Sequence, residues 1–284
     1  MQSSPSKAVL ITGCSSGIGR ATALYLVKQG WTVYATARKI EGLGDLEQAG
    51  CHLLPLDVTD EASMQSAVAS VERAEGAVGV LINNAGYSQS GAIESVAIER
   101  VRQQFETNVF GLVQMTQLVL PGMRRQHWGK IVNLSSMGGR LTFPGGGFYH
   151  STKYAIEALT DALRFEAAGF GIDAILIEPG LIRSSFGDRA AGSIDSATAS
   201  NDPYATFNTQ VAKATRDSYE RGPLARLGGT PENVAQTIAQ AIASPHSKAR
   251  YTVTPSARLL ITLRQILPDN VWDRFLGSQF PHPR

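Results

Sequence analysis

The first 37 residues alternate between strand-like and helix-like patterns, with three glycines at the turn between them. The run Lys7–Thr12 is short and apolar, and residues 12–19 contain the glycines. Apolar side chains then recur with helical spacing until Gly30, and Trp31–Ala37 again has a strand pattern. A strand, a glycine-rich turn, a helix and a second strand form a βαβ unit, so we predict an α/β fold with parallel strands.

The glycines of this turn predict a phosphate site. Glycine lets the backbone turn tightly and approach a pyrophosphate, and the following helix offers free N–H groups to it. A turn without a ligand is the alternative, but the position between a strand and a helix favours nucleotide binding. The second strand ends in Arg38 and Lys39, with no acid before Glu41. An acid there would bind the ribose hydroxyl of NAD, whereas an arginine suits the ribose phosphate of NADP(H), so NADP(H) is the favoured cofactor. The alternative is that Arg38 and Lys39 only solvate the end of the strand.

Similar units continue along the chain. Asp60 is the expected N-cap of one helix, and Asn108 lies inside another. An amide is a poor helix former, so Asn108 is either a satisfied core residue or a site residue. Strand patterns recur at residues 52–56, 78–82, 130–134, 172–177 and 251–254, and helical patterns at 60–74, 98–125, 153–168 and 231–244.

Tyr149 and Lys153 are four residues apart at the start of a helical pattern, so they share one face of the helix. Ser136 comes just after the strand at 130–134. An ammonium beside a phenol favours the phenolate, which predicts a pKa for Tyr149 below the usual value of about 10. Such a phenol is a general acid/base for an alcohol or a carbonyl. A surface pair is the alternative, and the glycine turn argues against it.

Composition excludes several classes of protein. The net charge is +2, with lysines and arginines dispersed, so we expect no nucleic-acid partner. The N-terminus lacks the apolar core of a signal peptide and no apolar stretch is long enough to cross a bilayer, so we expect a cytoplasmic protein. Cys14 and Cys51 have no metal-ligand spacing, and we expect no metal site.

The last hundred residues carry weaker signals. Residues 181–208 are rich in Ser, Ala, Asp and Gly and predict a mobile substrate loop, with a short helix near 203–219. Residues 255–284 contain many apolar side chains beside Arg258 and Arg264. A membrane-surface helix is one interpretation of this tail. Packing over the substrate entrance or against another subunit is favoured.

Six motifs follow one another along residues 7 to 254. They are Thr12-Gly13-x-x-x-Gly17-x-Gly19, Asn83-Asn84-Ala85-Gly86, Asn108, Ser136, Tyr149-x-x-x-Lys153 and Pro179-Gly180. This ordered series resembles the short-chain dehydrogenase/reductase family. The arginine at position 38 is similar to the NADP-preferring branch, and the chain looks most like the members that include 17β-hydroxysteroid and retinol dehydrogenases. Gly138 and Gly139 stand where the family has Ala-Gly, a mild departure.

This resemblance implies one Rossmann-type domain, a three-layer αβα sandwich around a seven-stranded parallel sheet with strand order 3-2-1-4-5-6-7. We expect that domain to span residues 1–254, with 183–228 as a substrate lid and 255–284 as an apolar extension. The family also implies a homodimer or homotetramer paired through the two long middle helices. Its partner would be a small-molecule alcohol or ketone.

The resemblance also implies roles for single residues. Tyr149 would be the general acid/base, and Ser136 would orient and polarise the substrate oxygen. Lys153 would lower the Tyr149 pKa and hold the nicotinamide ribose, while Asn108 would place a water. The residues between positions 13 and 19 that are named below would cradle the diphosphate. Asp57, Val58 and Asn84 would flank adenosine, and residues 179–182 would back the nicotinamide. The implied cofactor-binding residues are Gly13, Ser15, Ser16, Gly17, Ile18, Gly19, Arg38, Asp57, Val58, Asn84, Ala85, Gly86, Tyr149, Lys153, Pro179, Gly180 and Ile182.

These inferences predict an NADP(H)-dependent oxidoreductase that moves a hydride between nicotinamide and a secondary alcohol or ketone. The alternatives are a non-catalytic NADP-binding sensor and a 3-oxoacyl thioester reductase. Apolar residues near the motifs suggest a lipophilic substrate such as a steroid or retinoid, although core packing explains them equally well. They are Tyr87, Met137, Phe143, Phe148 and Phe186.

Overall fold

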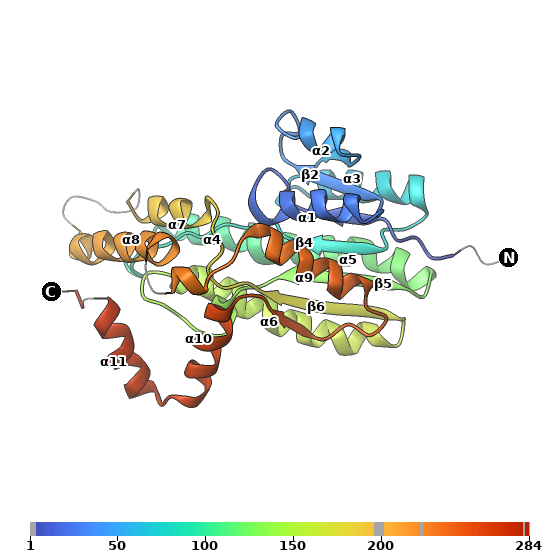
Figure 1. Ribbon diagram of the computed structural model, residues 1–284. Helices are drawn as coiled ribbons and strands as arrows, with labels where there is room; N and C mark the ends of the chain where they lie inside the picture. The colour runs from blue at the N-terminus through green and yellow to red at the C-terminus, as the bar shows by residue number, and fades with distance from the viewer. Residues whose placement is uncertain (1–3, 196–201, 222–223, 281, 284) are drawn as a thin grey trace.

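Seven parallel strands form one sheet in the order β3-β2-β1-β4-β5-β6-β7 in the computed structural model (Figure 1). The structure describes residues 4–195, 202–221, 224–280 and 282–283. The sheet has the strand order that the motif series implied. Its strands are β1 (Val9–Ile11), β2 (Val33–Ala37), β3 (His52–Pro55), β4 (Val80–Asn83), β5 (Gly129–Leu134), β6 (Ile172–Glu178) and β7 (Arg250–Thr252).

Helices cover both faces of the sheet and complete three layers (Figure 1). Helices α1 and α9 pack on one face, and α3, α5 and the end of α6 on the other. The helices are α1 (Gly17–Lys28), α2 (Gly44–Gln48), α3 (Glu61–Glu75), α4 (Ile98–Phe105), α5 (Gly111–Arg125), α6 (Gly147–Ala168), α7 (Phe186–Asp195), α8 (Ala205–Glu220), α9 (Pro231–Ala243), α10 (Pro255–Ile266) and α11 (Asp269–Gln279).

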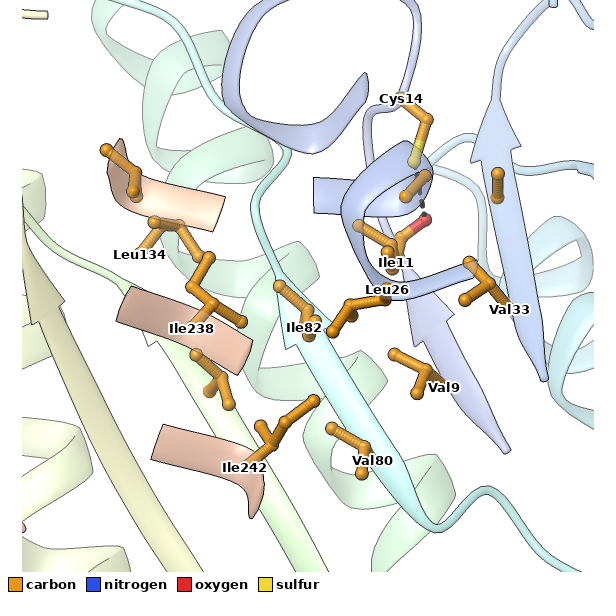
Figure 2. Close-up of a cluster of buried hydrophobic side chains, with 14 of the residues drawn as sticks. Val9, Ile11, Cys14, Leu26, Val33, Val80, Ile82, Leu134, Ile238 and Ile242 are labelled. Atoms are coloured by element: carbon orange, nitrogen blue, oxygen red, sulfur yellow. Dashed lines mark hydrogen bonds between the residues drawn. The ribbon is translucent and has the colours of Figure 1, made fainter. Parts of the chain in front are cut away.

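Alternation along the strands divides the core between these two faces. Val9 and Ile11 of β1 point to the α1 and α9 side, while Leu10 between them is buried on the opposite side. Figure 2 shows the first cluster, where Leu26 of α1 and Ile238 of α9 meet the strand side chains. Strands buried on both faces read as continuous apolar runs, which is why they were visible in the sequence.

The predicted helix over 98–125 is interrupted in its middle. Glu106–Phe110 form a π-helical turn between α4 and α5. A π turn holds one extra residue per turn and is common at functional sites. It contains Asn108, which is buried. The strand predicted at 78–82 is shifted and forms β4, and the short helix α2 was not predicted.

The predicted loop over 181–208 is wrong in part, because α7 lies within it. Apolar residues Ala191 and Ile194 of α7 are buried against Val211 and Ala212 of α8. The segment contains many small residues and few large apolar ones, so the apolar face that α7 packs against α8 was not recognised as a helical pattern. Helix α8 lies close to the predicted position, and residues 196–201 of this loop are outside the described residues.

The tail folds into α10 and α11, which pack back on the sheet domain. Leu260 and Trp272 of the tail are buried with Met137, Leu141 and Leu181. Figure 1 shows α7, α8, α10 and α11 gathered at the end of the sheet away from the N-terminus. Among the described helices, none combines the length and the hydropathy that a bilayer-spanning segment requires.

Candidate active site

The glycine turn opens at the start of α1. Gly13 and Gly17 have φ values of 76° and 61°, which side chains with a Cβ rarely adopt. At Gly17 an added Cβ would meet nothing within 4 Å, whereas at Gly19 it would lie 2.5 Å from the Gly13 carbonyl oxygen. Ser16, the N-cap, makes no side-chain capping bond. The helix end therefore presents free N–H groups to an open concavity that suits a diphosphate.

Asn84 supports this turn from the next strand of the sheet. Its Nδ2 donates to the carbonyl oxygens of Thr12 at 2.8 Å and Gly13 at 3.0 Å. The Thr12 hydroxyl in turn accepts from the backbone N–H groups of Asn84 and Ala85. Both amide hydrogens of Asn84 are thus used inside the turn. Only the Oδ1 atom of the Asn84 side chain remains to contact an adenosine.

Nearly all the predicted site residues line a single cavity of about 1910 Å³. It runs from the glycine turn past the carboxyl ends of the strands, where ligands bind in open α/β sheets. Gly19 and Asn108 are the two predicted site residues that do not line it. The wall includes Gly13, Ser15, Ser16, Gly17, Ile18, Arg38, Asp57, Val58, Asn84, Ala85, Gly86, Ser136, Tyr149, Lys153, Pro179, Gly180 and Ile182.

Asn108 lies behind the wall and holds it in shape. Its Oδ1 accepts from the Tyr87 N–H at 3.1 Å, and its Nδ2 donates to the Tyr87 carbonyl at 2.9 Å. The same Nδ2 donates to the Thr152 hydroxyl of α6 at 3.2 Å. Asn108 therefore ties the strand β4 loop to α6, three residues from Tyr149.

Ser136, Tyr149 and Lys153 meet in the middle of the cavity. The Ser136 hydroxyl is close enough to the Tyr149 phenol to act on its pKa, and it accepts from the Gly138 N–H at 3.1 Å. Helix α6 carries Tyr149 and Lys153 one turn apart, as predicted. The Lys153 ammonium donates to the Leu134 carbonyl at 2.6 Å and lies 5.7 Å from the centre of the Tyr149 ring.

The prediction of a lowered pKa for Tyr149 is wrong for this structure. Burial raises the pKa of Tyr149 above its usual value, with a further rise from Tyr219, and the Ser136 hydroxyl only partly opposes this. Burial also lowers the pKa of Lys153 to about 8, against the attraction of Glu157. Spacing alone placed the two groups together but said nothing of their removal from water, which is the larger effect.

A buried ionic network behind Lys153 was not predicted. Glu157, one turn further along α6, accepts from Arg250 Nε at 3.0 Å. Arg250 also lies 3.5 Å from Glu178, which pairs with Arg140 Nη1 at 3.2 Å. Glu157 four residues after Lys153 was the one visible signal. Arg250 and Glu178 come from distant strands and gave none.

The two ends of the cavity differ in character. Near the glycine turn, Arg38 and Lys39 line it together with Asp57, whose Oδ1 accepts from the Thr59 N–H and hydroxyl. The far end is mostly apolar, although Asp217 and Ser218 of α8 also line the cavity. Of the five apolar residues expected near the motifs, only Phe148 is absent from the wall. The apolar lining residues include Tyr87, Met137, Phe143, Phe186, Val211, Leu224, Leu259, Leu260, Leu263, Phe275 and Phe280.

The glycine cradle, the unpaired helix N-terminus and the basic strand end fit a nicotinamide dinucleotide. The concavity at Gly17 suits the diphosphate, and Arg38 at the end of β2 suits a phosphorylated ribose. Lys153 and Tyr149 lie further along the same cavity, in its middle, where a nicotinamide ring would sit. A proton donor and a reducing cofactor in one cavity are the parts that a carbonyl reduction needs.

Comparisons with known proteins agree with this arrangement. Residues 7–192 match the family model described as short chain dehydrogenase. A 3-ketodihydrosphingosine reductase of Bacteroides thetaiotaomicron is 36% identical, over 93% of this chain and 94% of the relative. An NADPH-dependent 3-dehydrocapnine reductase of Ornithobacterium rhinotracheale is 33% identical, over 93% and 94%. The crystal structure of a short-chain dehydrogenase from Streptomyces avermitilis is 34% identical with a TM-score of 0.79, covering 96% of both chains.

Proposed function

Because this chain belongs to the short-chain dehydrogenase/reductase family, we propose that it is an NADPH-dependent reductase of a ketone with a long apolar part. The observation that carries the proposal is the continuity of the cavity. It runs from the glycine turn, past Ser136 and Tyr149, to an apolar end roofed by α10 and α11. One ligand can therefore be held at each end, with the proton donor between them.

Tyr149 is the proposed proton donor. Because burial raises its pKa, the phenol keeps its proton at neutral pH, which is the form that a general acid requires. Ser136, which lines the same cavity beside Tyr149, would donate to the same substrate oxygen and stabilise the charge that develops there. The bound dinucleotide supplies the hydride. Lys153, fixed by the Leu134 carbonyl, would hold the nicotinamide ribose and return a proton to Tyr149.

Arg38 supports the choice of NADPH over NADH. It lines the cavity at the end of β2 and forms no ion pair within the described part of the chain. A guanidinium without a carboxylate partner is suited to a phosphate. The related 3-dehydrocapnine reductase, which is described as NADPH-dependent, supports the same choice.

The apolar end supports a long or bulky lipophilic group on the substrate. Leu259, Leu263 and Phe275 from the tail face it together with Val211 of α8. The volume exceeds the roughly 300–1,000 Å³ of ordinary ligand sites, which leaves room for a dinucleotide and such a group together. A steroid or a retinoid meets this requirement, and so does the substrate named for the 3-ketodihydrosphingosine reductase.

A series of ketones that differ only in chain length tests this function, with NADPH and NADH compared for each. Each methylene that enters the apolar end should raise kcat/KM by about fourfold, since its burial contributes about 0.8 kcal/mol. No turnover of any ketone despite tight NADPH binding would favour a sensor. A preference for thioester-linked keto acids would favour the acyl reductase instead.

We also propose that two copies pair through α5 and α6. Large apolar side chains stay exposed on these helices or beside them, with Phe165 77% exposed and Phe110 55%. Tyr154 and Leu159 of α6 are also exposed. Exposed apolar clusters of this kind mark contact surfaces. Sedimentation of a Phe110→Glu, Phe165→Glu variant should show a smaller particle than the wild type.

A further inference from the structure

Helix α7 lines the cavity and contacts both Tyr149 and the glycine turn. At its first residue, the Phe186 ring centre is 5.5 Å from that of Tyr149. One turn later, Arg189 Nη2 lies 3.4 Å from the Ser16 hydroxyl of the glycine turn. This one short helix therefore touches both the proposed proton donor and the proposed diphosphate cradle.

The surroundings of Arg189 favour the binding of an anion. It lines the cavity, and its Nε donates to the Ser185 carbonyl at 3.2 Å, which fixes the direction of the guanidinium. Within the described residues no carboxylate pairs with it. Its neighbour Ser16 uses no side-chain atom to cap α1. A guanidinium and a free helix N-terminus that face one concavity both favour negative charge there.

Two positive groups thus stand at different parts of the proposed dinucleotide site. Arg38 lies at the end of β2, where the adenosine ribose would be bound, and Arg189 lies over the start of α1. A ligand with a phosphorylated ribose would meet Arg38 with that phosphate. The diphosphate, which NADPH and NADH share, would meet Arg189.

We infer that Arg189 binds the diphosphate of the nicotinamide dinucleotide and that α7 is a cover which the cofactor holds in place. The inference rests on the proposed cofactor site. It extends that site from the glycine turn to a helix far along the chain. Because α7 packs on α8 through Ala191 and Ile194, an anchored α7 also fixes the helix that lines the apolar end. Cofactor binding would then complete the substrate site.

The first test measures Kd for NADPH and for NADH by nucleotide fluorescence. Arg189→Ala should weaken both by a similar factor, on the order of tenfold, which corresponds to the loss of one charge-assisted contact. Arg38→Ala should weaken NADPH alone. Arg183→Ala is the matched control, because Arg183 is exposed on the same segment and does not line the cavity. It should bind both nucleotides as the wild type does.

The outcomes separate the inference from the proposed function. Loss of NADPH affinity alone in Arg189→Ala would place Arg189 on the ribose phosphate, and unchanged affinity for both nucleotides would remove it from the site. Either result overturns the inference and leaves the reductase proposal intact. A wild-type protein that binds neither nucleotide would contradict the proposed function itself.

Hydrogen exchange tests the cover directly, without any substrate. Saturating NADPH should slow exchange of the α7 amides in the wild type and in Arg183→Ala. In Arg189→Ala at saturating NADPH, the amides at the start of α1 should remain protected while those of α7 should not. Arg189→Lys should recover part of the protection, since it keeps the charge but loses the fork of donors. Equal protection of α7 in wild type and Arg189→Ala would disprove the cover.

Discussion

The two ends of the cavity are built in different ways. The cofactor end depends on backbone groups of residues 12–19, supported by one amide from Asn84. The substrate end depends on side chains from the 3-10 turn η2 (Met137–Gly139), α6, α7, α8 and the tail, which are far apart in sequence. The first end is local and needs glycine geometry. The second is a tertiary surface made by side chains from separate elements.

The first prediction is that one substitution lowers turnover strongly and leaves NADPH affinity nearly unchanged. Tyr149→Phe removes the proposed proton donor at the junction of the two ends, and turnover should fall about 10³-fold. NADPH affinity should stay within about twofold, since the cradle is untouched. Stopped-flow kinetics and fluorescence titration measure the two quantities. Turnover close to that of the wild type would mean that another group donates the proton.

The second prediction concerns the packing of the substrate end. Burial lowers the pKa of His150 to about 4, so the folded protein keeps this imidazole neutral. The unfolded chain takes up the proton near pH 6.5, so it binds more protons than the folded protein between these values. The free energy of unfolding should therefore fall as pH drops from about 6.5 to about 4, by roughly 3 kcal/mol from this residue.

Urea unfolding at pH 4.5 and 7.5 measures this change. His150→Asn should show a smaller difference between the two pH values than the wild type. His246→Asn, which changes an exposed histidine, is the control and should retain the full difference. An unchanged difference in His150→Asn would show that other groups cause the acid sensitivity.

The third prediction compares one glycine from each end. Gly19→Ala places a Cβ 2.5 Å from the Gly13 carbonyl oxygen, so the turn must shift. It should lower the free energy of unfolding by about 2 kcal/mol and weaken both nucleotides. Gly192→Ala in α7 meets nothing within 4 Å and should raise stability by about 0.5–1 kcal/mol. Thermal unfolding with and without NADPH tests the contrast, and similar effects of both variants would contradict it.

The smallest expected effect is on substrate choice. Leu259 of α10 lines the apolar end and is 44% exposed, so Leu259→Asn should fold normally. It should lower kcat/KM by about fivefold for long-chain ketones and leave short ones unchanged, since one apolar contact is lost. Ile266→Asn lies on the same helix outside the cavity and serves as the control. An equal loss for short and long ketones would argue that the tail does not contact the substrate.

The features that depend on neighbouring residues could be predicted from the amino-acid sequence. The glycine turn follows from backbone conformations within eight residues, and its place before α1 follows from the strand and helix patterns around it. The shared face of Tyr149 and Lys153 follows from their spacing on α6. The order of the strands came from the resemblance, because periodicity identifies strands but not their neighbours.

The electrostatics and the shape of the cavity became known from the folded structure. The pKa of Tyr149 moved in the direction opposite to the prediction, because burial removes the phenol from water and the electrostatic effect of Tyr219 adds a further rise. The roles of Arg250, Glu178 and Arg189 were not predicted either, because each contacts a residue more than 70 positions away in the sequence. Spacing along a chain fixes which residues share a face. Desolvation and charge depend on everything that packs around them, and those neighbours are known only once the chain is folded.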